Sequence, residues 1–194
     1  MNEILKQLLK NNPLRFNIKQ YQKDTTIFYE NEECKNIALI IKGKVKISSY
    51  TNFGNEVIYS IINEGNFFGN HLSFSNQSSY RGNVICLENT QIGFISIKDF
   101  IELLSSNNDF LKYYLAYQSE QVKALNAKIK ILSLSNAEER FLYYLSINNN
   151  KITYSSITSL ANEINLRRET LSRLISDLIS QNKIIKTNKT IRKK

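Results

Sequence analysis

The chain has 194 residues, of which 42% are hydrophobic, so it is long enough for one large domain or two small ones with real cores. Its formal net charge of +9 at pH 7 favours a polyanionic partner. No apolar run is long enough to span a membrane and the first residues lack a signal peptide, so we expect a cytoplasmic protein without a membrane partner.

The first predicted elements are a short amphipathic helix over residues 1–12, ended by Pro13, and then a β-rich region from about 16 to 97. Turns rich in glycine or asparagine separate its short apolar runs, and KVKIS alternates polar and apolar residues as a half-buried antiparallel strand does. Many short strands with frequent turns predict a sandwich or barrel. The expected strands are TTIFY, IALIIKG, KVKISSY, EVIYSII, GNVICL and QIGFISI.

The pattern becomes helical after Lys98, with a short helix in IKDFIELLSSN and a long one over residues 109–134. Apolar residues in the long helix follow a heptad spacing, and Lys and Glu flank them, so the apolar stripe is narrow. We favour a homodimer seam over packing within one chain, with Gln118 as the polar residue that fixes register. The seam consists of Leu111, Leu115, Gln118, Val122, Leu125, Ile129 and Leu132.

A second helical region follows the motif SNAE, which fits a capping box with Ser135 as N-cap and Glu138 reaching back. Two further helices are predicted over about 155–163 and 168–181, followed by a hairpin that turns at TNKT. Asn165 tolerates the left-handed conformation that the turn between these helices needs. This is the pattern of a helix-turn-helix with a wing. Its expected core is Ile157, Leu160, Ala161, Ile164, Leu171, Leu174 and Leu178.

The positive charge is concentrated near this motif: from Ile164 onward, nine lysines and arginines face two acidic residues, so +7 of the +9 lies there. At the start of the second helix, Arg168 and Arg173 can each present a bidentate fork to guanine, and Glu169 can accept from a cytosine amino group. The alternative is an ordinary solvated face with Arg–Glu pairs. Residues suited to phosphate contacts and general affinity are Arg167, Thr170, Ser172 and Lys189.

The stretch RRETLSRLISDLISQNKI resembles the recognition helix of the cyclic-AMP receptor protein/Fnr (Crp/Fnr) family of bacterial regulators, whose pattern is R-E-T-hydrophobic-x-R-x-hydrophobic. The resemblance implies an α+β chain, with an N-terminal β-roll (a cyclic-nucleotide-binding-like jelly roll), a long dimerisation helix and a C-terminal winged helix-turn-helix. It places a sensor domain at 1–108, the dimerisation helix at 109–134 and the DNA-binding domain at 135–194. The glycines where that family has its turn glycines are Gly43, Gly54, Gly65 and Gly69.

The function that this resemblance implies is sequence-specific transcription regulation by a homodimer bound to a palindromic site in double-stranded DNA and controlled by an effector at the β-roll. The base readers would be Arg168, Glu169 and Arg173, on a half-site near TGTGA. RNA polymerase would be a further partner if the protein is an activator.

The sensor stretch FFGNHLSFSNQSSYRGN departs from the nucleotide-binding relatives, which have Gly-Glu-Leu with the glutamate on the ribose. Asn70, after Gly69, replaces that glutamate, and Arg81 would reach a phosphate only if the loop shifts by one residue, so we do not expect cyclic AMP. His71 lies about where haem-dependent relatives have a haem ligand, so haem stays open beside another ligand or none. An iron–sulfur cluster is not expected because Cys34 and Cys86 are the only cysteines.

Two other classes of protein compete with a regulator. A cupin-type metal enzyme needs several histidine and glutamate ligands, whereas the chain has one histidine, and we expect no enzymatic activity. A ligand-binding module that does not touch DNA remains the second alternative. Duplex binding that weakens steeply with salt and prefers one palindrome would distinguish a regulator from such a module.

Overall fold

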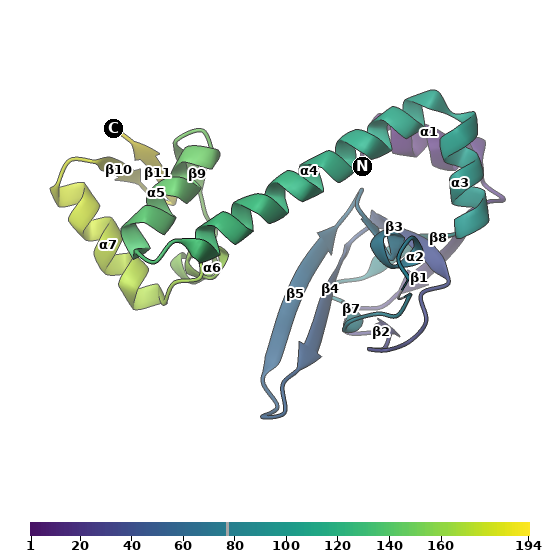
Figure 1. Ribbon diagram of the computed structural model, residues 1–194, viewed down its shortest axis with the longest axis horizontal. Coiled ribbons are helices and arrows are strands. Elements are labelled where there is room, and N and C mark those ends of the chain that lie inside the picture. The colour runs from purple at the N-terminus through teal and green to yellow at the C-terminus, as the bar shows by residue number, and fades with distance from the viewer. Residues whose placement is uncertain (77) are drawn as a thin grey trace. The chain divides into compact units, whose positions relative to one another are not determined.

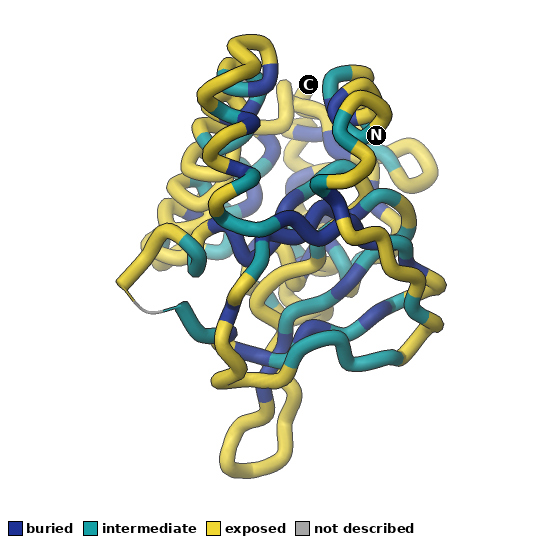
Figure 2. The backbone as a smooth tube through the Cα atoms, turned by 90° about the vertical axis from the view of Figure 1, so that its right-hand side faces the viewer, coloured by how far each residue is buried: buried dark blue, intermediate teal, exposed yellow. Residues whose placement is uncertain are grey.

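The computed structural model describes residues 1–76 and 78–194, and the chain forms two compact units, Met1–Leu115 and Ala116–Lys194 (Figure 1). Each unit has a hydrophobic core of its own. Figure 2 shows buried residues along the inner sides of the strands and helices, whereas the outlying turns are exposed. No helix in the described ranges is both long and apolar enough to cross a membrane.

Two four-stranded antiparallel sheets form the framework of the N-terminal unit, with strand orders β1-β8-β3-β6 and β2-β7-β4-β5. Apart from β4 and β5, sheet neighbours come from distant parts of the chain, because the other successive strands pass from one sheet to the other. This is the predicted β-roll, and β4 and β5 form its long hairpin (Figure 1). The strands are β1 (Asn17–Tyr21), β2 (Thr26–Phe28), β3 (Asn36–Lys42), β4 (Lys44–Tyr50), β5 (Glu56–Asn63), β6 (Phe67–Phe68), β7 (Asn83–Cys86) and β8 (Thr90–Ser96).

Glycine is required at the turn between β3 and β4. Gly43 has a φ of 91°, and a Cβ there would lie 2.6 Å from the Thr90 hydroxyl oxygen and 2.8 Å from the Asn89 carbonyl oxygen. Any other residue would clash and would also strain the backbone. The predicted turn glycines all have positive φ, which confirms this part of the prediction: Gly43, Gly54, Gly65 and Gly69.

Aromatic rings fill much of the β-roll interior. Phe28 stacks on Tyr80 with ring centroids 4.5 Å apart, and Phe94 meets Phe28 edge-on at 5.9 Å. Burial raises the pKa of the Tyr80 hydroxyl, and the neighbouring Cys34 raises it further. Cys34 and Cys86 are both buried free thiols. The interior is therefore a packed core that includes the two thiols.

Among the described residues, four helices belong to this unit wholly or in part: α1 (Glu3–Asn11), α2 (Asn70–Ser73), α3 (Ile97–Ser106) and α4 (Asn108–Ser133). Ser96 caps α3 by accepting a hydrogen bond from the Asp99 amide at 3.0 Å. Helix α4 has 26 residues and continues into the C-terminal unit.

The C-terminal unit is a winged helix-turn-helix, as predicted. Its three-stranded antiparallel sheet has the order β10-β11-β9. Of the residues expected to interlock the helix pair, five are buried, and Ile157 and Leu174 pack on their core. The elements are α5 (Ala137–Ile147), β9 (Lys151–Thr153), α6 (Ile157–Glu163), α7 (Arg168–Ser180), β10 (Ile184–Thr187) and β11 (Thr190–Lys193).

One local prediction is wrong: the N-cap of α5 is Asn136 and not Ser135. The Asn136 side chain accepts from the Glu138 amide at 2.8 Å. Asparagine and serine cap equally well, so the residue at which the helix begins in the folded unit decides which of the two is the N-cap. Sequence patterns also missed β1, whose residues are nearly all exposed, and β6 and α2, which have two and four residues.

Candidate nucleic-acid interface

The turn between α6 and α7 closes in a Schellman motif, which is built from hydrogen bonds within the turn itself. The Leu166 amide donates to the Ala161 carbonyl at 2.9 Å, and the Asn165 amide donates to the Asn162 carbonyl at 3.3 Å. Asn165 has a φ of 52°, so it adopts the predicted left-handed conformation. Leu166 packs against the core of the unit and fixes the angle at which the chain enters α7.

Helix α7 has one buried and one exposed face, as the helical spacing of its apolar residues predicts. Leu171, Ile175 and Leu178 are 0–3% exposed and belong to the core. The exposed residues at the start of the helix are Arg167, Arg168, Glu169, Thr170, Ser172 and Arg173. All six candidate residues of this segment therefore lie together on solvent-facing surface at the helix N-terminus.

The charge of this surface is not neutralised from within the described part of the chain, where Arg167, Arg168, Glu169 and Arg173 make no ion pair. The C-terminal unit has fourteen lysines and arginines against six acidic residues, so +8 of the net +9 belongs to it. Unpaired guanidinium groups at a helix N-terminus are suited to phosphate oxygens and to the acceptor edge of guanine.

The wing contributes one further cation. Lys189 lies in the turn between β10 and β11, beside Asn188, which has a φ of 52°. The Lys189 carbonyl accepts from the Tyr154 amide at 3.0 Å, while its side chain is exposed. The backbone bond fixes the turn and leaves the ammonium group in solvent, as a phosphate contact requires.

The heptad stripe of α4 is exposed along most of its length. Leu115, Val122, Leu125, Ile129 and Leu132 are between 51% and 58% exposed. Leu111 and Gln118 are intermediate. Five large apolar side chains that are each about half exposed recur along one helix face. Exposed apolar residues gathered in this way typically mark a protein–protein contact.

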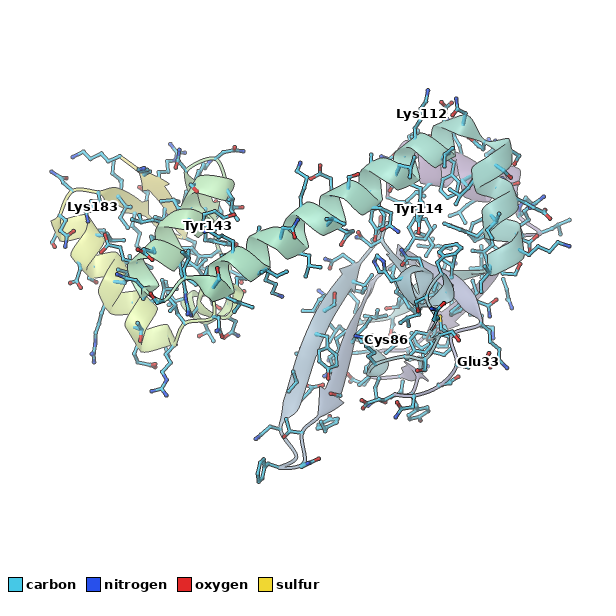
Figure 3. The ribbon with its side chains drawn as sticks, in the orientation of Figure 1. Glu33, Cys86, Lys112, Tyr114, Tyr143 and Lys183 are labelled. Atoms are coloured by element: carbon cyan, nitrogen blue, oxygen red, sulfur yellow. The ribbon has the colours of Figure 1, made fainter. Side chains whose placement is uncertain are left out.

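The four candidate effector residues differ in burial. Asn70 is fully buried, and its Nδ2 donates to the hydroxyl of Tyr114 on α4 at 3.1 Å (Figure 3 labels Tyr114). His71 and Arg81 are exposed. Gly69 has a φ of 79° and packs on Cys34, whose sulfur would lie 2.9 Å from an added Cβ.

The buried polar atoms of Asn70 show what this site can offer to a ligand. The Asn70 side chain is a neutral amide, and its Nδ2 already donates to Tyr114. Its Oδ1 has no hydrogen-bond partner among the described residues. The site therefore offers one buried neutral acceptor.

Two residues that form hydrogen bonds near these sites were not identified from the sequence. Tyr114 lies off the heptad stripe, and no local pattern connects it with Asn70, which is 44 residues away. Arg140 donates to the backbone carbonyls of Leu134, before α5, and of Asn165, in the turn between α6 and α7. Its neighbours Glu138 and Glu139 make it look like an ordinary charged helix position.

The sequence is similar to a known domain family and to known transcriptional regulators. The family Cyclic nucleotide-binding domain matches residues 18–107. The cAMP-activated global transcriptional regulator CRP of Escherichia coli O6:H1 is 25% identical over 184 residues, which cover 90% of this chain and 88% of that protein.

Solved structures share the fold at low sequence identity. A cyclic nucleotide-binding domain containing protein from Listeria monocytogenes has a TM-score of 0.70 at 17% identity, covering 98% of both chains. A CooA mutant from Carboxydothermus hydrogenoformans has a TM-score of 0.69 at 19% identity, covering 98% of this chain and 89% of that one.

Proposed function

Because the chain belongs to the Crp/Fnr family of transcriptional regulators, we propose that it binds a palindromic duplex site as a homodimer and reads that site with α7. The observation that carries this proposal is the exposed group Arg168, Glu169 and Arg173, which follows the turn between α6 and α7 and makes no ion pair with any described residue. In this proposal the two arginines read guanine and Glu169 reads cytosine.

The remaining candidates have a different role in this proposal. Arg167, Thr170, Ser172 and Lys189 contact phosphates and set affinity and register, while they carry no sequence information. The net charge of the C-terminal unit supplies the general attraction to DNA. RNA polymerase is a further partner if the bound protein activates transcription.

The homodimer in this proposal forms along the exposed stripe of α4. Two recognition helices related by a twofold axis would read two half-sites about one helical turn apart. The exposed apolar residues of the stripe support this arrangement, since a solvated stripe of that size is costly to leave uncovered.

The effector in this proposal is a small ligand other than cyclic AMP, although the curated relative is named as cAMP-activated. Asn70 cannot accept as a carboxylate does, and its buried Oδ1 suits a ligand that donates a hydrogen bond. Isothermal titration calorimetry should detect no micromolar binding of cyclic AMP. Micromolar binding would overturn this part of the proposal.

His71 remains a candidate haem ligand, since it is an exposed imidazole beside the buried Asn70. An absorption spectrum of the protein purified from its native host separates this alternative from another ligand. A Soret band that His71→Ala removes would identify haem, whereas a spectrum without it would leave a different effector, which mass spectrometry of the same sample can identify.

The function is tested by selecting duplexes from a random library with the full-length protein and then measuring affinity for the selected sequence. A regulator should select a palindrome, bind it at least about a thousandfold more tightly than a scrambled duplex, and lose affinity steeply as salt rises. A ligand-binding module that does not touch DNA would select nothing.

A further inference from the structure

Arg140 connects two segments of the C-terminal unit that are distant in sequence. It lies one turn into α5 and is half-buried. Its Nε donates to the Leu134 carbonyl at 2.6 Å, and one Nη donates to the Asn165 carbonyl at 3.0 Å. One guanidinium group therefore holds both segments at once.

The two carbonyls belong to functionally distinct places. Leu134 directly follows the last residue of α4, and its amide donates to the carbonyls of Lys130 and Ile131 in the last turn of that helix. Asn165 is the left-handed residue of the turn that leads into α7. A cation at the C-terminal end of α4 is also favoured by the helix dipole.

Neighbouring contacts make this region one continuous body. Ile131 of α4 is 3% exposed and lies in the same core as Leu171 and Ile175 of α7. Four residues after Arg140, on the same face of α5, the Tyr144 hydroxyl donates to the Glu163 carboxylate at the end of α6. The last turn of α4, helix α5 and the turn before α7 are thus linked by packing and by hydrogen bonds.

We propose that Arg140 is a positioning residue for DNA recognition, which holds the turn before α7 in a fixed place relative to the end of α4. This rests on the proposed function. The planar guanidinium donates in two directions at once, whereas a lysine ammonium keeps the charge without that fixed fork. Loss of the fork leaves the charge of the unit unchanged and lets the recognition arginines move relative to the helix that carries the partner protomer.

The test compares Arg140→Lys with the wild type on the palindrome that the wild type selects and on a scrambled duplex. We expect affinity for the palindrome to fall about tenfold, the size of one lost or misplaced bidentate base contact. Affinity for the scrambled duplex and the salt slope should stay unchanged, because the number of positive charges is the same. If Arg140 only stabilised the fold, the variant would contain less folded protein. The apparent affinities for the palindrome and for the scrambled duplex would then fall together.

Tyr144→Phe is the matched control, since it removes a hydrogen bond from the same face of α5 without touching the end of α4. It should keep the ratio of palindrome to scrambled affinity. The proposal is overturned by an unchanged ratio in Arg140→Lys, by an equal loss on both duplexes, or by an equal loss of ratio in Tyr144→Phe. A wild type that prefers no duplex at all would instead overturn the proposed function.

Hydrogen exchange provides a second measurement that needs no variant. If the end of α4 and the turn before α7 are coupled, binding of the palindrome should slow exchange of the Leu134 amide as well as that of Leu166. Unchanged exchange at Leu134 on DNA binding would overturn the proposal even if the lysine variant does not fold.

Discussion

The exposed side chains at the start of α7 and in the wing differ in what their loss should change. A guanidinium that reads a base edge contributes at one base pair, whereas a cation on phosphate contributes equally at every sequence. Arg173 and Lys189 represent these two cases, and neither makes an ion pair within the described residues, so each can be removed without leaving a described acidic partner behind.

Arg173→Ala should weaken binding to the selected palindrome by about 1–3 kcal/mol and relax discrimination at one base pair of each half-site. Lys189→Ala should weaken binding to all duplexes alike and reduce the salt slope by about one per chain. Both are measured with a panel of single-base variants at two salt concentrations. An equal loss on every variant for Arg173→Ala would make Arg173 a phosphate contact.

Asn70 illustrates a residue whose role depends on its burial. In sequence it is a polar residue in a loop, whereas the structure buries it completely and joins it to Tyr114 on α4. Rings of Phe67 and Phe100 surround that tyrosine, with centroids 5.9 Å and 5.1 Å away. Asn70 is therefore joined by a hydrogen bond to the N-terminal part of the long helix α4.

Among the elements, α5 has a cap that can be tested by a single pair of substitutions. Asn136→Ala should lower the free energy of unfolding of the C-terminal unit by about 1 kcal/mol, because the Glu138 amide loses its acceptor. Ser135→Ala, one residue earlier, should change it little. Urea unfolding followed by circular dichroism measures both. A larger loss of unfolding free energy for Ser135→Ala than for Asn136→Ala would indicate that Ser135 is the N-cap, as the sequence predicts.

Helix α4 combines a 26-residue length with an apolar stripe that the described residues leave more than half exposed over most of its length. Val122→Glu combined with Leu125→Glu should give monomers in sedimentation, because a dimer would bury four carboxylates in its seam. Ala116→Glu with Ala124→Glu adds the same charge at exposed positions off the seam and should leave the dimer intact. Dimers that persist at low concentration in the first variant would contradict the seam.

At the scale of the whole molecule, charge is divided very unequally, with +8 on Ala116–Lys194 and +1 on the remainder. The β-roll unit is therefore nearly neutral, and attraction to a polyanion belongs to the helix-turn-helix unit. A dimer would bring two such charged units to one duplex. The distance between its two recognition helices would then set the separation of the half-sites.

Inserting five base pairs at the centre of the selected palindrome should reduce affinity to that of a single half-site, since half a helical turn moves one half-site to the opposite face of the duplex. The seam variant should bind the original and the lengthened palindrome equally. Fluorescence anisotropy with labelled duplexes measures both. Full affinity of the wild type for the lengthened palindrome would indicate that each protomer binds independently.

Much of the fold could be predicted because its signals are local. Heptad spacing, turn glycines, the asparagine before α7 and the two-faced pattern of α7 each operate within a few residues, and the structure confirms the β-roll, the long helix and the winged helix-turn-helix. The six α7 candidates could be grouped for the same reason, since a single helix brings them together. Their roles on DNA stay predictions.

The tertiary structure decided what depends on contacts between distant residues. Asn70 meets Tyr114 across 44 residues, and Arg140 meets Asn165 across 25, and no periodicity connects either pair. The tertiary structure also decided that Asn136 and not Ser135 is the N-cap, because the start of α5 depends on how Phe141 and Leu145 pack in the core. The sequence by itself determined the order and type of the longer, strongly patterned elements, while packing determined the short elements β6 and α2 and which polar side chains join distant segments.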